Sequence, residues 1–281
     1  MFRDDLLRDA SILITGGGTG LGRAMAERCG ALGAAVGVVG RRTAPLEETV
    51  AAIRDAGGRA AWASADVRDP DSLRAAVDAI EAELPPLTAL VNNAAGNFLA
   101  ASEDLSANAF DAVVRIVLHG TFHASQIVGQ RWIERGTPGQ LLSIVTTYAW
   151  MGSAFVLPSA CAKAGVLAMT RSLAIEWATY GIRANAIAPG PFPTEGAFSR
   201  LMPEAMVEDA RKNHPLQRFG EPPELADLAA YLLSPMATYI NGECVTIDGG
   251  EWLKHGQEFS SFTSLPRAQV KGMMAQLKPK K

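Results

Sequence analysis

Short apolar runs alternate along this chain of 281 residues with longer segments whose apolar positions recur at helical spacing. The short runs predict strands over 12–15, 35–39, 60–65, 89–92, 141–146, 183–187 and 243–247. The longer segments predict helices over 21–32, 44–56, 71–84, 108–135, 158–180 and 222–234. This alternation is typical of a parallel sheet covered by helices on both faces, with right-handed crossovers between strands. We therefore expect an α/β protein.

Two local signals for the ends of helices agree with this pattern, one at a helix start and one at a helix end. Asp69-Pro70 is a typical helix start, and Gly57-Gly58 is a typical helix end. The pattern contains no repeat and no domain boundary, so we expect residues 1–281 to form one catalytic domain. The Pro- and Gly-containing stretch 189–219 is predicted to be a substrate loop or lid. Residues 251–281 are expected to form a C-terminal tail with a short helix over 267–277.

The segment Ser11–Gly22, SILITGGGTGLG, places a glycine cluster between the first strand and the first helix. Such a turn presents backbone N–H groups to a pyrophosphate at the start of a helix. Its glycines are spaced G-x-x-x-G-x-G, which suits a tight turn and a close phosphate approach. The turn residues predicted to bind a dinucleotide are Thr15, Gly16, Gly18, Thr19, Gly20 and Leu21.

The ends of the second and third strands indicate which dinucleotide binds. Arg41 and Arg42 follow the second strand, where NAD-binding proteins tend to carry an acid. Guanidinium groups pair with phosphate, so we expect the 2′-phosphate of NADPH there. The alternative is a pair of solvated surface arginines. Asp66 and Val67 close the third strand and are expected near the adenine, although an ordinary turn aspartate is the competing interpretation.

Polar residues also follow the fourth and fifth strands, at the sheet edge where open α/β proteins bind ligands. Asn93, Ala94 and Gly96 are predicted to contact the cofactor. Asn97 lies beyond that turn, Tyr148 follows the fifth strand, and Lys163 lies in the next helix. A buried lysine beside Tyr148 would lower the phenol pKa from about 10, which would help it to donate a proton.

Composition narrows the function classes. Hydrophobic residues make up 48% of the chain, and the formal charge of −3 gives no support for nucleic-acid binding. The sequence has no apolar run long enough to cross a membrane and no apolar signal segment, so we expect a cytoplasmic protein without membrane insertion. Three separated cysteines and four histidines without ligand spacing predict neither disulfides nor a metal site.

Together these residues resemble the short-chain dehydrogenase/reductase family. The resemblance rests on TGGGTGLG at 15–22, NNAAG at 92–96, Lys163, Pro189-Gly190 and Asp248-Gly249-Gly250. It implies a doubly wound Rossmann fold with a mostly parallel seven-stranded sheet, a homotetramer, and hydride transfer with NAD(P). It also implies that Pro189 and Gly190 bind the cofactor.

The chain departs from the usual family pattern at three positions. Ser159 stands where most members carry a tyrosine four residues before the lysine, Val117 replaces an asparagine, and Thr146 replaces a serine. One branch of the family, the NADPH-dependent 2,4-dienoyl-CoA reductases, is similar in these places. The similar segments are 92–98, 116–122, 143–165, 189–191, 196–201 and 249–259.

This second resemblance implies roles for four residues and a reaction. Tyr148 and Asn97 would bind the thioester oxygen, with Lys163 and Ser159 completing the catalytic set. NADPH would reduce a 2,4-dienoyl-CoA to a 3-enoyl-CoA in the β-oxidation of unsaturated fatty acids, with hydride to Cδ and a proton to Cα. Two alternatives stay open: a reductase of 3-ketoacyl or 2-enoyl thioesters, and an inactive NADP-binding regulatory protein.

Overall fold

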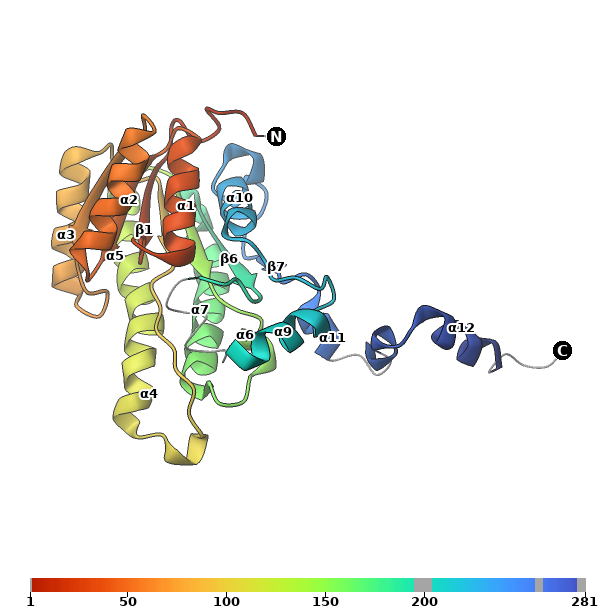
Figure 1. The fold of residues 1–281 in the computed structure, drawn as a ribbon. Coiled ribbons are helices and arrows are strands. Elements are labelled where there is room, and N and C mark those ends of the chain that lie inside the picture. The colour runs from red at the N-terminus through yellow and green to blue at the C-terminus, as the bar shows by residue number, and fades with distance from the viewer. Residues whose placement is uncertain (1, 195–203, 256–259, 277–281) are drawn as a thin grey trace.

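A single parallel sheet of seven strands forms the centre of the computed structural model, which describes residues 2–194, 204–255 and 260–276 (Figure 1). The strands lie in the order β3-β2-β1-β4-β5-β6-β7. Their bounds are β1 Ser11–Thr15, β2 Ala35–Gly40, β3 Arg59–Ser64, β4 Ala89–Asn92, β5 Gly139–Ile144, β6 Ile182–Pro189 and β7 Cys244–Ile247. The order reverses between β1 and β4, which places a ligand crevice at their carboxyl ends.

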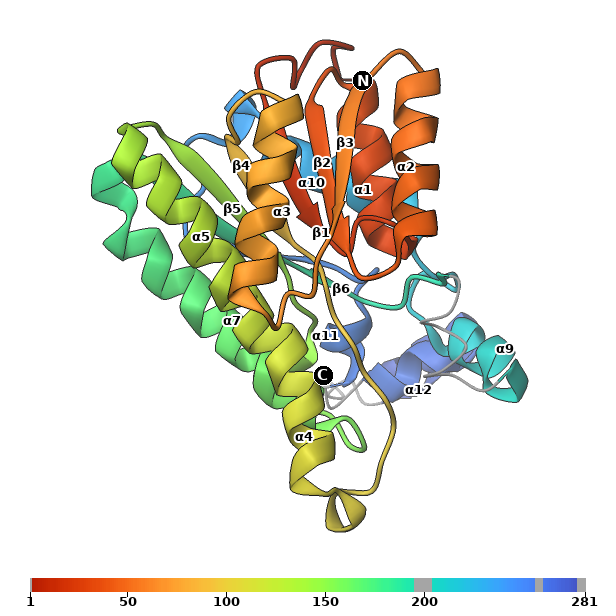
Figure 2. The ribbon, with the colours of Figure 1, turned by 90° about the vertical axis from the view of Figure 1, so that its left-hand side faces the viewer.

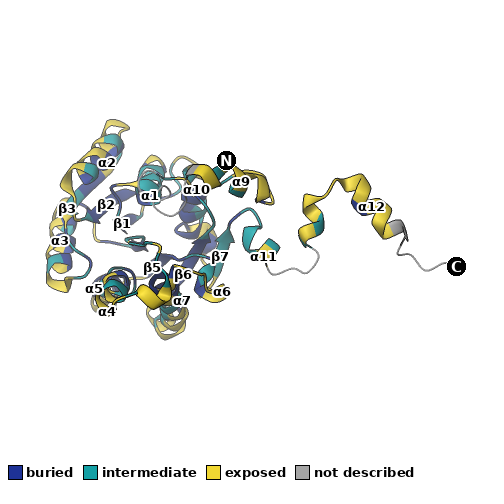
Figure 3. Cartoon of the chain, turned by 60° about the horizontal axis from the view of Figure 1, so that its bottom comes forward, coloured by how far each residue is buried: buried dark blue, intermediate teal, exposed yellow. Residues whose placement is uncertain are grey.

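Helices cover both faces of this sheet (Figures 2 and 3). On one face lie α1 Gly20–Ala31, α2 Thr43–Asp55 and α10 Pro222–Leu232, and on the other lie α3 Pro70–Glu83, α5 Gly120–Arg135 and α7 Leu157–Glu176. The α/β, doubly wound architecture expected from the sequence is confirmed. The predicted helix start is also present, since the Asp69 carboxylate accepts hydrogen bonds from the backbone N–H groups of Asp71 and Ser72.

The central strand shows why the sheet needs both helical layers. Every residue of β1 is buried, and its alternate side chains belong to different clusters. Ile12 and Ile14 pack in the cluster that contains α1 and α10 residues, whereas Leu13 packs in the cluster of α3 and α5. Successive strand side chains point to opposite faces, so an apolar run without alternation needs cover on both sides.

The helix expected over 108–135 contains an irregularity. It comprises α4 Ala107–Val114, a π-helical segment Arg115–His119, and α5. The Gly120 N–H donates to the carbonyl of Arg115, five residues earlier, which is the π pattern. A Cβ at Gly120 would lie 2.6 Å from Val67 Cγ2, so glycine allows this helix to approach the loop after β3.

Four shorter helices follow strands β5, β6 and β7 along the chain. They are α6 Tyr148–Met151, α9 Glu204–Asn213, α11 Glu251–His255 and α12 Arg267–Gln276. The remaining turns are 3₁₀ helices at Ser102–Asp104, Ala178–Tyr180, Pro235–Ala237 and Ser260–Ser264. The similar segment 196–201 lies outside the described residues. Within the described residues, none of the helices has the length and apolarity needed to span a membrane.

Candidate active site

The turn after β1 is built around glycine backbone. Gly16 and Gly20 have φ of +67° and +55°, in the left-handed region that glycine adopts without strain. At Gly22, a Cβ would lie only 2.2 Å from the Gly16 carbonyl oxygen. The first turn of α1 therefore packs directly on the loop before it, and the N-terminus of α1 faces the crevice.

Thr15 and Asn93 join this turn to the end of β4. The Thr15 hydroxyl accepts hydrogen bonds from the backbone N–H groups of Asn93 and Ala94, both at 3.1 Å. The Asn93 amide donates to the carbonyl oxygens of Thr15 and Gly16 at 3.0 and 3.2 Å. Both side chains thus fix the shape of the crevice from beneath it. Asn92, one residue earlier, donates instead to the buried Ser125 hydroxyl at 2.9 Å.

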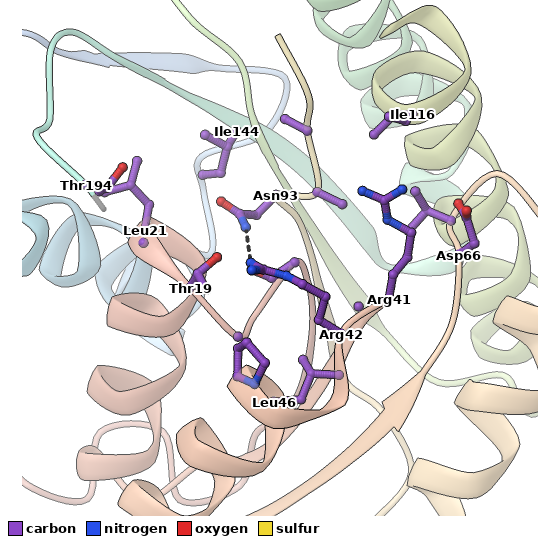
Figure 4. A pocket seen from close by; sticks show the side chains of 18 of the residues that line it. Thr19, Leu21, Arg41, Arg42, Leu46, Asp66, Asn93, Ile116, Ile144 and Thr194 are labelled. Atoms are coloured by element: carbon purple, nitrogen blue, oxygen red, sulfur yellow. Dashed lines mark hydrogen bonds between the residues drawn. The ribbon is translucent and has the colours of Figure 1, made fainter. Parts of the chain in front are cut away.

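A cavity of about 400 Å³ opens where these loops meet (Figure 4). Twelve of the residues predicted to bind the cofactor line it: Gly16, Gly18, Thr19, Gly20, Leu21, Arg41, Arg42, Asp66, Val67, Asn93, Ala94 and Lys163. The sequence interpretation missed further lining residues, including Thr194, Ile116, Ile144 and Leu46. These are mainly apolar or follow irregular backbone, so no motif marks them.

Four other residues predicted to bind the cofactor are not among the residues lining this cavity in the described chain: Thr15, Gly96, Pro189 and Gly190. Each contributes to the surrounding backbone instead. A Cβ at Gly96 would contact Ile116 at 3.3 Å, and one at Gly190 would lie 2.7 Å from Asp248 Cβ. Pro189 is the strand partner of Ile247 in the β6–β7 register.

The two arginines after β2 point into the cavity (Figure 4). Both are exposed, and neither guanidinium forms an ion pair within 4 Å among the described residues. Asp66 is engaged differently, because its carboxylate binds the Arg68 guanidinium at 2.9 Å. That hydrogen bond, with the nearby charge of Arg41, lowers the pKa of Asp66. The cavity therefore presents two exposed positive charges to an anionic ligand.

Beside this cavity, three polar side chains from separate parts of the chain meet. The Tyr148 hydroxyl lies 3.0 Å from the Ser159 hydroxyl, and the Asn97 amide donates to Tyr148 at 3.3 Å. Asn97 also accepts from the Phe98 N–H through its own carbonyl oxygen, which fixes the direction of its amide. The three residues come from the loop after β4, the short helix α6 and the first turns of α7. A phenol and a carboxamide thus share one small region.

The direction of the Tyr148 pKa differs from the sequence expectation. Burial raises the pKa of the phenol above its ordinary value of 10.0, and hydrogen bonds with Ser159 and Thr146 only partly oppose this. Lys163 is not among the groups that act on it. The expectation of a lysine-lowered pKa is therefore wrong for this structure. The Tyr148 phenol is therefore neutral near pH 7.

Lys163 is buried in α7, four residues after Ser159 and so on the same face of the helix. Its ammonium group donates a hydrogen bond to the carbonyl oxygen of Ile144, at the end of β5. Burial lowers the pKa of Lys163 to about 8. Because Lys163 lines the cavity and Ser159 binds Tyr148, this helix face joins the cavity to the polar cluster.

Comparisons with known proteins identify the family. A family model described as enoyl-(acyl carrier protein) reductase matches residues 16–251. A crystal structure of a short chain dehydrogenase from Bacillus anthracis is 42% identical, with a TM-score of 0.81, over 90% of this chain and 99% of that one. The chain belongs to the short-chain dehydrogenase/reductase family.

Among curated members of this family, two relatives are informative. A Bacillus subtilis protein named as a probable, (2E)-enoyl-CoA-producing 2,4-dienoyl-CoA reductase is 45% identical over 86% of this chain and 96% of its own length. A peroxisomal, (3E)-enoyl-CoA-producing 2,4-dienoyl-CoA reductase of Arabidopsis thaliana is 37% identical over 96% of this chain and 91% of its own. A solved variant of actinorhodin polyketide ketoreductase with NADPH is 30% identical, with a TM-score of 0.81, over 86% of this chain and 97% of that one.

Proposed function

We propose that this oxidoreductase uses NADPH to reduce a 2,4-dienoyl-CoA to a 3-enoyl-CoA in the β-oxidation of unsaturated fatty acids. The observation that carries the proposal is the contact of Tyr148 with Asn97 and Ser159 beside the nucleotide cavity. Position 159, where most family members have tyrosine, is a serine that here supports a tyrosine from another helix. The names of the curated relatives support the same substrate class.

The residues of the cavity fit NADPH. The backbone of the turn after β1 would hold the pyrophosphate, because that turn begins the helix α1 and leaves no room for a side chain at Gly22. Arg41 and Arg42 would hold the 2′-phosphate, since both charges face the cavity without an ion-pair partner in the described chain. Lys163 would contact the nicotinamide ribose. NADPH, when bound, supplies the hydride that the proposal directs to Cδ.

Tyr148 and Asn97 would act on the thioester oxygen. Negative charge reaches this oxygen through the conjugated chain as the reduction proceeds, and the phenol O–H and amide N–H are donors that can stabilise it. A phenol with the ordinary pKa of 10.0 is protonated near pH 7, and burial raises the pKa of Tyr148 further, which suits a donor. Removing one donor of this kind typically lowers the rate by about 10²–10³.

Ser159 would orient the phenol. Its hydroxyl can donate to Tyr148, which leaves the Tyr148 hydrogen free for the substrate oxygen. After charge has collected on the enolate, Tyr148 or a water that it holds would protonate Cα. Protonation at Cα with hydride at Cδ leaves the double bond between Cβ and Cγ, which defines the 3-enoyl product.

The test compares wild type with Tyr148→Phe, using NADPH and 2,4-hexadienoyl-CoA and following nicotinamide absorbance. We expect turnover in the wild type and a loss of about 10²–10³ in the variant, with NADPH affinity unchanged. Near-wild-type turnover by Tyr148→Phe would reject the phenol as donor. Product analysis by mass spectrometry and NMR distinguishes a 3-enoyl from a 2-enoyl product.

One rival has support of its own, because the matching family model is described as an enoyl-(acyl carrier protein) reductase. Crotonyl-CoA and acetoacetyl-CoA serve as comparison substrates for this rival and for a ketoacyl reductase. A rate with either one that exceeds the hexadienoyl-CoA rate would displace the proposal. No turnover with any of the three, despite NADPH binding, would favour the inactive regulatory protein.

We also propose that the chain forms a homotetramer, as the family implies. Helices α5 and α7 carry exposed apolar side chains, Phe122 and Ile175, that an assembly would cover. The cytoplasmic location stays a prediction from the sequence.

A further inference from the structure

The turn that carries Tyr148 is short and has an exposed aromatic side chain. Helix α6 has only four residues, Tyr148–Met151, and ends at Gly152 with a φ of +72°. Ala149 faces the interior, whereas Trp150 is 40% exposed. A single helical turn has little stability of its own. Its position must therefore come from side chains that pack on it.

Trp150 receives such a contact from the segment after β7. Its ring lies 5.6 Å from that of Trp252 in α11, at an interplanar angle of 84°. This edge-to-face arrangement is a favoured geometry for aromatic pairs. The pair joins α6 to α11, which is distant from it in the sequence. None of the roles proposed above involves α11.

Asp248 holds Trp252 in place. Its side chain is buried, and one carboxylate oxygen accepts from the Gly250 N–H while the other accepts from the Trp252 N–H, both at 2.8 Å. Gly249 and Gly250 have φ of +60° and +86°, which allows the chain to turn sharply after β7. Trp252 is therefore fixed to the end of the sheet rather than to the loops around the cavity.

We propose that Trp252 is a positioning residue for the Tyr148 phenol. Residues two apart in a helical turn point in nearly opposite directions, so Trp150 faces α11 while Tyr148 faces Ser159 and Asn97. Trp252 thus supports the turn from the side away from the polar cluster. The inference rests on the proposed donor role of Tyr148.

Loss of this support should affect the rate more than binding. A small displacement of the turn moves the phenol away from the substrate oxygen, and misplacement of about 1 Å can cost up to about 10²-fold in rate. We expect Trp252→Ala to lower kcat about fivefold to tenfold with KM for NADPH unchanged. Trp252→Phe keeps an aromatic partner and should stay within about twofold of wild type. Tyr239→Ala, at a fully exposed ring, is the matched control.

A double-mutant cycle with Tyr148→Phe separates the two roles that Trp252 could have. If Trp252 acts through the phenol, Trp252→Ala has no further effect on kcat once that hydroxyl is absent. Trp150→Ala removes the other ring and should behave like Trp252→Ala, which keeps the test usable if Trp252→Ala does not fold. An equal loss in both backgrounds would overturn the inference and leave the proposed function standing. Near-wild-type activity of Tyr148→Phe would overturn both.

Discussion

Under the proposed use of NADPH, we expect replacement of Arg41 and Arg42 by glutamine to remove most of the preference for NADPH over NADH. Both guanidiniums point into the nucleotide cavity, and neither forms an ion pair among the described residues. A 2′-phosphate would be their partner, whereas NADH offers only a hydroxyl there. The two substitutions remove charge and keep hydrogen-bonding groups.

The magnitude follows from the exposure of both side chains. Hydrogen bonds to charged groups contribute about 1.5–3 kcal/mol each, and solvent reduces this at exposed sites. Loss of both should cost about 2–3 kcal/mol, which weakens NADPH binding about 30- to 150-fold. NADH binding should change less than about threefold. Arg74→Gln, an exposed arginine on α3 outside the cavity, is the matched charge control.

Titration of each variant with both cofactors, by calorimetry or by fluorescence, measures these constants directly. Raising the ionic strength should also reduce the wild-type preference, because the Debye length falls from about 10 Å at 0.1 M to about 3 Å at 1 M salt. Equal losses for NADPH and NADH would refute the assignment of these arginines to the 2′-phosphate, as would equal affinities of the wild type for both.

Three further predictions concern stability and assembly. Burial lowers the pKa of Lys163 to about 8, from an ordinary value of about 10.5. Below pH 8 the buried charge therefore lowers the free energy of unfolding by about 3 kcal/mol, and this loss disappears as the pH rises from about 8 to about 10.5. Denaturant unfolding of wild type and Lys163→Met should show this as a pH-dependent difference, and a constant difference would contradict it. Gly22→Ala should weaken NADPH binding about tenfold or more and lower the unfolding midpoint, because the added Cβ would lie 2.2 Å from the Gly16 carbonyl oxygen. Binding of NADPH by this variant as tight as in the wild type would disprove the close packing. Ile175→Glu should shift the proposed tetramer to smaller species in light scattering, and an unchanged mass would place the proposed interface elsewhere.

The sequence was most informative where structure is determined by neighbouring residues or by a repeating hydrophobic pattern. Buried strands and amphipathic helices can be read from periodicity, and the Asp69 cap and the glycine turn from residue type. The short helix α6 was not predicted, because four residues hold no period. The π segment at Arg115–His119 was missed for a similar reason, because five residues within a longer helical pattern also show no period of their own.

In the candidate site, too, some features could be predicted from the sequence and others depend on contacts between distant segments. Family resemblance selected Tyr148 and Asn97, and the structure brings both together with Ser159. The direction of the Tyr148 pKa could not be read from the sequence, because it depends on burial and on which group reaches the phenol. The contact of Trp150 with Trp252 joins distant segments and leaves no local pattern.

The Thr15 hydroxyl ties two parts of the site together in a way that matters for redesign. It binds the backbone of Asn93 and Ala94, so the glycine turn and the loop that leads to Asn97 share one anchor. A substitution in the turn would disturb catalysis along with cofactor binding. Arg41 and Arg42 are exposed residues after β2 and take no part in the Thr15 hydrogen bonds, so an engineer who wishes to exchange one coenzyme for the other should begin there.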